Sequence, residues 1–340
     1  MSGERAYIYA KACGIIGKSF VGKRIHALEN VNRLAELDRL VFPEGGRELP
    51  ERELLPDLEK RITARSIAQI STIIGCFRNP PELLVLLLQS YEYENLKNTL
   101  AALANNEAKP PRITDIGKFR TVNFEAYPNI EGMLKNTEFE FLLKNELKET
   151  PKPLQDASAL QTKIDMHYYT RLYAALGRLP RMDRLGIEKI VDDEIRLRNV
   201  SWTLRLRTYY NMSVERIKTM LITIDEKKDF TGDALASCAF SLDTRDDWTH
   251  WKWAKFVNSE SPTANSPYWS LDPRYFQNKA SHYLYKCTYE SFHTKPFSLV
   301  PAFCFIRLKQ SEEDLLTSVA EGFGFGLPCR ETLGLLGVAS

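Results

Sequence analysis

The sequence lacks the residue patterns of a disulfide-stapled, metal-binding or hydrolytic protein. Its six cysteines include no Cys-x-x-Cys pair, so they indicate neither a disulfide framework nor a structural zinc site. Its five histidines show no His-x-x-x-His ligand spacing, and no Gly-x-Ser-x-Gly nucleophile elbow is present. We therefore expect no metal site, no cofactor and no catalytic residue.

The chain also has little net charge and no long apolar run. Its 46 basic and 44 acidic residues leave a formal charge of +2, which creates no general field that attracts nucleic acid. The longest purely apolar run, Leu83 to Leu88, is far shorter than the roughly 18 residues that span a bilayer. Residues 1–20 carry basic side chains and lack the apolar core of a secretion signal. We expect a cytoplasmic protein that inserts nothing into a membrane.

The sequence does contain one pattern that occurs three times. Each copy has a helical stretch, a proline-marked turn, and a longer leucine-rich run with a small polar residue among its apolar positions. This order predicts three antiparallel helical hairpins. Strict strand alternation and Asn-Gly turns are absent, which favours an all-α fold. The predicted hairpins join 59–75 with 80–103, 163–177 with 180–210, and 278–292 with 296–323.

The three copies divide the chain into three expected helical units, 1–110, 111–212 and 213–340. The first boundary lies at Lys109-Pro110-Pro111 and the second lies between Asn211 and Asp229. A chain of 340 residues is long enough for two or three cores. Two further stretches, 42–56 and 243–273, have the composition of loops or insertions.

The small polar residues of the three copies are Asn95, Asn199 and Asp314. On a helical wheel of 180–210, Asn199 lies among apolar side chains, and a second apolar stripe lies on the nearly opposite face. A helix that is apolar on two faces is packed between neighbours. Because a buried polar group must find hydrogen-bond partners, we expect these three residues to fix helix register rather than to act in catalysis.

Four arginines occupy the narrow edges between those two apolar faces, and no acidic residue occurs from Ile195 to Val214. They have two interpretations: edges of a packed helix whose guanidinium groups reach solvent, or an interface for an anionic partner. The candidate interface consists of Arg196, Arg198, Arg205 and Arg207.

Two other motifs suggest ligand binding. Residues 12–19 fit a relaxed phosphate-loop pattern, in which Lys18 and Ser19 would hold a nucleotide and magnesium, with Asp225 as the second metal-holding residue. Repeated strand–helix alternation, the scaffold that such a loop requires, is missing. Trp248, Trp251 and Trp253 lie among cations, as in single-strand binders, but there is no wider basic groove, which favours a folded insertion or a contact with a partner.

Three segments together resemble a known family. They are Tyr7-Ile8-Tyr9-Ala10-Lys11-Ala12 leading into Gly22-Lys23-Arg24-Ile25, Tyr91-Glu92-Tyr93-Glu94-Asn95-Leu96-Lys97, and Asp193-Glu194-Ile195-Arg196-Leu197-Arg198-Asn199. In order and spacing the chain resembles the central-stalk subunit of V-type ATPases and ATP synthases, which is of C type in bacteria and archaea and of the equivalent d type in eukaryotes. The likeness extends faintly over nearly the whole chain.

The resemblance implies an all-helical funnel of three similar units around a pseudo-threefold axis. Such a socket sits on the cytoplasmic face of the membrane rotor ring of proteolipid subunits and receives the D- and F-type shaft subunits. It transmits torque between the shaft and the ring, and so couples ATP hydrolysis or synthesis to proton or sodium transport. It catalyses no reaction itself. The chain departs from the family pattern in Asp314, where asparagine is expected, and in its Gly-rich tail, 322–340.

Two alternatives remain open at this stage. A P-loop nucleotide hydrolase would use Lys18 and Ser19, and a helical-repeat adaptor of an unrelated complex would share every feature read from the residues themselves. Only the identity of the partners separates the adaptor from the rotor subunit.

Overall fold

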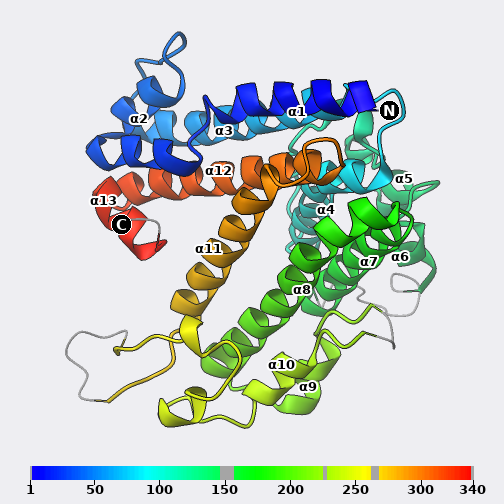
Figure 1. Ribbon diagram of the computed structural model, residues 1–340. Coiled ribbons are helices and arrows are strands. Elements are labelled where there is room, and N and C mark those ends of the chain that lie inside the picture. Colours follow the sequence, from blue (N-terminus) through cyan, green and yellow to red (C-terminus); the bar gives the residue numbers. More distant parts are fainter. Residues whose placement is uncertain (1, 146–156, 225–227, 262–267, 338–340) are drawn as a thin grey trace. The chain divides into compact units, whose positions relative to one another are not determined.

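The computed structural model describes residues 2–145, 157–224, 228–261 and 268–337 (Figure 1). Every regular element in these ranges is a helix. The leucine-rich runs supply residues of high helix propensity, and their apolar side chains are buried by packing between helices. The prediction of an all-α fold is confirmed.

The chain forms two compact units. The larger unit comprises Met1–Arg78 and Leu179–Ser340, and the smaller unit comprises Asn79–Arg178. These boundaries differ from those expected near residues 110 and 212. The division into three similar helical units stays a prediction.

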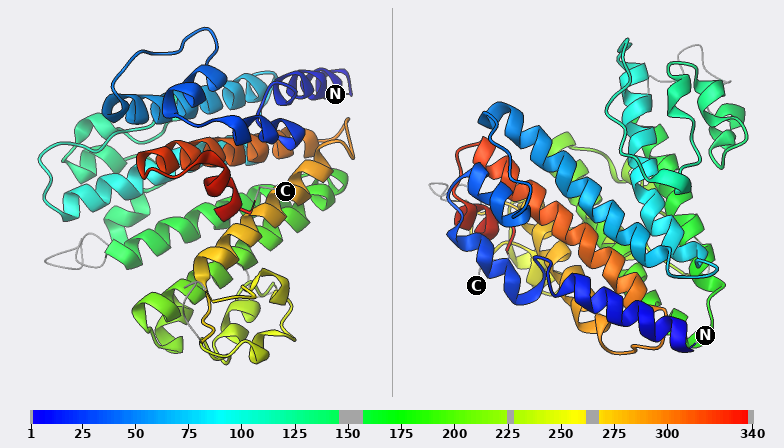
Figure 2. Two further views of the ribbon diagram at one scale, coloured as in Figure 1. Left: turned by 90° about the vertical axis from the view of Figure 1, so that its left-hand side faces the viewer. Right: turned by 90° about the horizontal axis from the view of Figure 1, so that it is seen from above.

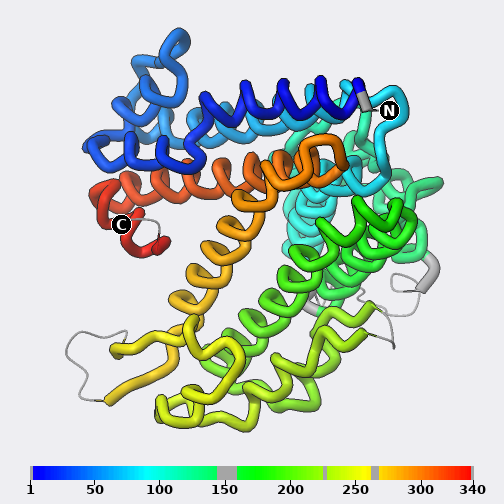
Figure 3. The backbone as a smooth tube through the Cα atoms, viewed as in Figure 1, coloured from blue at the N-terminus to red at the C-terminus, as the bar shows by residue number. Residues whose placement is uncertain are grey.

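The larger unit holds most of the helices, which can be followed along the trace in Figure 3. They are α1 (Ser2–Ile16), η1 (Gly22–Asn30), α2 (Leu34–Val41), α3 (Glu51–Ile74), α8 (Arg181–Tyr210), α9 (Val214–Thr219), α10 (Gly232–Ser237), η4 (Asp246–Trp248), η5 (Ala254–Phe256), α11 (Pro273–Phe292), α12 (Val300–Gly324) and α13 (Cys329–Leu335).

In its described residues, 79–145 and 157–178, the smaller unit has two long helices and four short ones. They are α4 (Glu82–Ala104), η2 (Gly117–Phe119), η3 (Phe124–Ala126), α5 (Ile130–Leu134), α6 (Glu140–Asn145) and α7 (Ala157–Gly177).

Prolines mark the starts of the long helices, as the sequence indicates. Helices α4 and α8 begin directly after Pro81 and Pro180, because a proline at a helix start loses no intrahelical hydrogen bond. Helix α12 begins at Val300, with Pro301 in its first turn, and not at Pro296. Helix α8 ends at Tyr210 and is capped by Asn211, whose left-handed φ of 46° lets the next N–H, of Met212, bond back to the carbonyl of Leu206 at 3.2 Å.

All six predicted hairpin helices are present, and the third hairpin, α11 with α12, packs as predicted. Helices α3 and α4 belong to different units, and so do α7 and α8. Helix α4 packs on α7, α8 packs on α11, and α12 packs on both α11 and α3. The second helix of each copy therefore packs on the first helix of the next copy. In the last copy, α12 packs on α3, the first helix of the first copy. A short turn shows that two helices are joined, but not which helix covers their apolar faces.

The pair α4–α7 in the smaller unit is antiparallel. Lys97 Nζ of α4 lies 3.0 Å from Asp165 Oδ1 of α7, and Glu82 at the start of α4 pairs with Arg178 just beyond α7.

The pair α3–α12 in the larger unit is antiparallel as well. Ser66 of α3 donates a hydrogen bond to the carbonyl oxygen of Lys309 at 3.3 Å. Nearer the start of α3, a Cβ built on Gly324, the last residue of α12, would lie 3.0 Å from Leu55 Cδ2.

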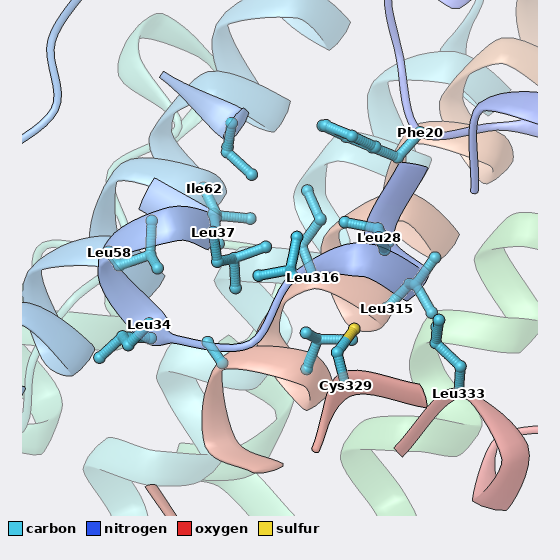
Figure 4. Close-up of a cluster of buried hydrophobic side chains, with 14 of the residues drawn as sticks. Phe20, Leu28, Leu34, Leu37, Leu58, Ile62, Leu315, Leu316, Cys329 and Leu333 are labelled. Carbon is cyan, nitrogen blue, oxygen red and sulfur yellow. The ribbon is translucent and has the colours of Figure 1, made fainter. Parts of the chain in front are cut away.

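Helices α1, α3 and α12 lie side by side in the larger unit (Figure 2, right). Leucine and isoleucine side chains of α3 and α12 meet those of η1, α2 and α13 in one core, of which Leu58, Ile62, Leu316 and Leu333 are fully buried (Figure 4). This core fixes the end of α12 against the N-terminal helices.

A second core in the larger unit surrounds the C-terminal half of α8. Trp248, Trp251 and Trp253 are buried in it, together with Phe256 and Phe276. The ring of Trp251 stacks on that of Phe276, with centroids 5.7 Å apart. Since base stacking requires exposed aromatic faces, these tryptophans form a folded insertion and not a single-strand binding surface.

Candidate functional site

Two buried asparagines fasten irregular segments to the long helices. Asn95 of α4 donates a hydrogen bond to the carbonyl of Thr114 at 2.7 Å and accepts one from its N–H at 2.9 Å. Asn199 of α8 donates to the carbonyls of Ile222 and Phe230, each at 2.9 Å, and accepts from the Ile222 N–H at 2.8 Å. Each side-chain amide thus supplies the hydrogen-bond partners for backbone groups of the segment that follows the helix carrying the asparagine.

The two asparagines satisfy their polar atoms in the same way. Their exposed fractions are 3% for Asn95 and 2% for Asn199, so water cannot replace the lost partners. The bonds go to the segment that follows each helix and not to a neighbouring helix. The predicted role in helix register stays a prediction; the observed contact positions a loop.

The third predicted anchor, Asp314, is exposed, so the expectation that it is packed like Asn95 and Asn199 needs correction. The buried acidic residue of α12 is Glu312, which accepts a hydrogen bond from the Phe20 N–H at 2.7 Å. Two residues of helix correspond to a rotation of about 200°, which turns a side chain to the other face.

Glu312 belongs to a buried ionic cluster. It pairs with Lys309, and both side chains are 2% exposed. Lys309 Nζ also donates to Ser19 Oγ at 3.1 Å, and Arg65 Nη2 lies 3.6 Å from Glu312 Oε1. Burial lowers the pKa of Lys309, and the Glu312 carboxylate opposes this shift. The charge of Lys309 therefore depends on Glu312.

A second buried carboxylate, Glu92, strengthens the anchor in α4. It is fully buried and accepts hydrogen bonds from the N–H groups of Thr121 and Val122 at 2.6 and 2.7 Å. Glu92 lies three residues before Asn95, on the same face of the helix. Sequence reasoning missed both Glu92 and Glu312; the available signal was a carboxylate within an apolar helical run.

The four arginines do not form one cluster. Arg207 donates to the carbonyls of Ser237 and Phe240 at 2.6 and 2.7 Å, which caps the end of α10, and burial lowers its pKa. Arg196 lies 3.8 Å from Asp193 and over the ring of Phe230. Arg198 and Arg205 are exposed. A partner contact by this set stays a prediction.

The structure contradicts the phosphate-loop alternative. Residues 2–16 form helix α1, and the N–H groups of Gly17 and Lys18 bond to carbonyls of the same turn at 2.9 and 3.0 Å. Ser19 is buried and donates to the carbonyl of Ile15. No amide cradle for a phosphate is left, because these donors are already bonded. Asp225 lies outside the described residues.

The described part of the chain shows no metal-ligand group and no membrane span. Histidine, cysteine, aspartate and glutamate side chains nowhere gather there in threes that could hold a metal ion. None of its helices is both long and apolar enough to cross a bilayer.

Comparison with known proteins decides the family. The family model of the ATP synthase (C/AC39) subunit matches residues 46–332. The chain belongs to the ATP synthase (C/AC39) subunit family. Over 337 residues it is also 25% identical to an "Uncharacterized protein" of Treponema pallidum (strain Nichols), with 96% of each chain covered.

Membership in the ATP synthase (C/AC39) subunit family confirms the resemblance seen in the spaced motifs. The protein is therefore a structural component of a V-type ATPase or ATP synthase complex, and not a catalytic one. The matched range begins just before α3 and ends within α13, so it includes every long helix except α1.

We expect Asn199→Ala to lower the free energy of unfolding by about 2–4 kcal/mol, because three buried backbone groups lose their partner. Equilibrium chemical denaturation measures the change, and hydrogen exchange at the Ile222 amide should become faster. Asn278→Ala is the control: its amide makes one exposed hydrogen bond, to the carbonyl of Leu335 at 2.6 Å, which water can replace. Equal effects of the two substitutions would contradict the anchor.

We expect Lys309→Met and Glu312→Gln each to destabilise the protein by about 3–5 kcal/mol, since each leaves a buried charge without its partner. The double variant should be much less destabilised than the sum of the two, because neither charge remains. A double-mutant cycle by chemical denaturation measures this coupling. Additive effects would show that the two side chains do not act as a pair.

Proposed function

We propose that the chain is the non-catalytic rotor subunit that couples the central shaft of a V-type ATPase or ATP synthase to its membrane ring. The observation that carries this proposal is the family match over residues 46–332. In this role the chain receives the D- and F-type shaft subunits on one side. On the other it rests on the proteolipid ring, at the cytoplasmic face of the membrane, and serves proton or sodium transport.

The anchors of the long helices support such a mechanical role. A body that passes torque must resist bending where helices meet irregular segments. In α4, α8 and α12 a buried side chain holds the backbone N–H of such a segment: Asn95 at 2.9 Å, Asn199 at 2.8 Å and Glu312 at 2.7 Å. Because these bonds are shielded from water, opening them costs more than opening a surface contact.

The order in which the helices pack supports three similar helical units. Each long helix packs on the first helix of the next copy, and α12 packs on α3. Thr114 follows Asn95 by 19 residues, and Ile222 follows Asn199 by 23 residues. Glu312 instead holds Phe20, near the start of the chain. The N-terminal segment is thus held by α12 as the following segments are held by α4 and α8.

The experiment mixes the purified chain with the shaft subunits and with the detergent-solubilised membrane ring, and follows association by size-exclusion chromatography. We expect a stable complex with at least one of them, and with both together a ternary complex. No association with either would contradict the proposed function.

The same assay tests the exposed arginines of α8. We propose that Arg198 and Arg205 contact a partner, so Arg198→Glu with Arg205→Glu should weaken association through charge repulsion. Arg33→Glu with Arg39→Glu, both exposed near α2, is the charge-matched control. Full assembly and coupled transport by the α8 variant would exclude this contact.

A further inference from the structure

One corner of the larger unit exposes apolar side chains on a rigid base. Met182 and Leu185 of α8 and Phe297 of the turn between α11 and α12 are exposed by 65%, 52% and 64%. Large apolar side chains exposed in a group mark contact sites more often than single ones do.

A buried carboxylate, Asp183, makes the base of this corner. It is 2% exposed and accepts hydrogen bonds from Arg5 of α1 at 2.9 and 3.2 Å and from the Leu299 N–H at 2.9 Å. Arg5 also donates to the carbonyl of Phe297 at 3.4 Å. Asp183 therefore joins α1, the start of α8 and the α11–α12 turn, and it fixes the backbone that presents Phe297.

The helix geometry places the apolar side chains beside the turn. A side-chain Cβ built on Gly186 would lie 2.5 Å from Val300 Cγ2 and 3.8 Å from Lys295 Nζ, so the Gly186 side of α8 faces the turn. At about 100° per residue, Met182 is about 40° around the helix from Gly186, and Leu185 is about 100° from Gly186 in the same direction. We call Met182, Leu185 and Phe297, with the basic residues described next, the corner patch.

The charge of the corner patch has one sign. Arg181 and Lys189 are exposed on the Leu185 side of α8, and Lys295 is half-buried in the turn. The two carboxylates beside them on α8 already have basic partners: Asp183 is bonded to Arg5, and Glu188 Oε1 lies 2.9 Å from Lys228 Nζ. An apolar centre with a basic rim is complementary to a segment that carries apolar and acidic side chains.

We infer that the corner patch docks an acidic, apolar segment of another protein of the complex. Three basic side chains are fewer than the cluster of about four to eight that holds a protein on anionic lipid. The net charge of +2 adds little further attraction to a bilayer. A protein partner instead uses a few desolvated apolar anchors with charges at the rim. The inference deepens the proposed function and rests on it.

The test measures binding of the full-length chain to three probes separately: the shaft subunits, the detergent-solubilised membrane ring, and vesicles of phosphatidylglycerol. We expect Leu185→Ser with Phe297→Ser, and Arg181→Glu with Lys189→Glu, to weaken binding to one of the two protein probes by at least about tenfold. All four positions are exposed, so folding should be retained, which circular dichroism verifies.

Matched controls lie beyond the other end of α12. Phe325→Ser and Arg330→Glu change an exposed aromatic residue, 83% exposed, and an exposed basic residue, and they should bind as the unmodified chain does. If the corner-patch variants also bind unchanged, the inference is overturned while the proposed function stands. If only vesicles bind through the corner patch, the inference is likewise overturned. If the unmodified chain binds neither protein probe, both fall.

Discussion

The structure depends on one kind of interaction: a hydrogen bond from the backbone N–H of an irregular segment to a polar side chain buried in a long helix. Asn95, Asn199 and Glu312 provide it in α4, α8 and α12. Each of these helices is covered by apolar neighbours, so a loop that crosses it must bury backbone polar groups. The side-chain partner removes most of the cost of that burial. These hydrogen bonds fix the positions of the loops, and with them the surfaces that the loops form.

The sequence predicts the local parts of this fold well. Leucine periodicity and prolines before Glu82 and Arg181 mark helix starts, because these signals act within a few residues. The amides of Asn95 and Asn199 stand out for the same reason: each is a polar residue in an apolar run. Which helices pack together is set by contacts between distant residues. The turn between α11 and α12 joins two helices that pack on each other, whereas the other two proline-marked turns join helices of different units.

The third anchor shows where such reasoning fails. Asp314 and Glu312 are two residues apart, and a shift of two residues reverses the face of a helix. A lysine three residues before a glutamate is also typical of a solvated helix surface. Only the packing shows that Lys309 and Glu312 are buried and paired. The splitting of the four arginines into internal and exposed pairs depends in the same way on tertiary contacts.

In the proposed role the chain acts through its stiffness and through the surfaces it presents, so its motion tests that role most directly. The measurement is single-molecule rotation: the assembled complex is fixed by its catalytic part, and a probe on this chain is observed during ATP hydrolysis. If the chain couples the shaft to the ring, the probe turns with the shaft, in steps that follow hydrolysis. A chain that stays stationary while the shaft turns would contradict that role.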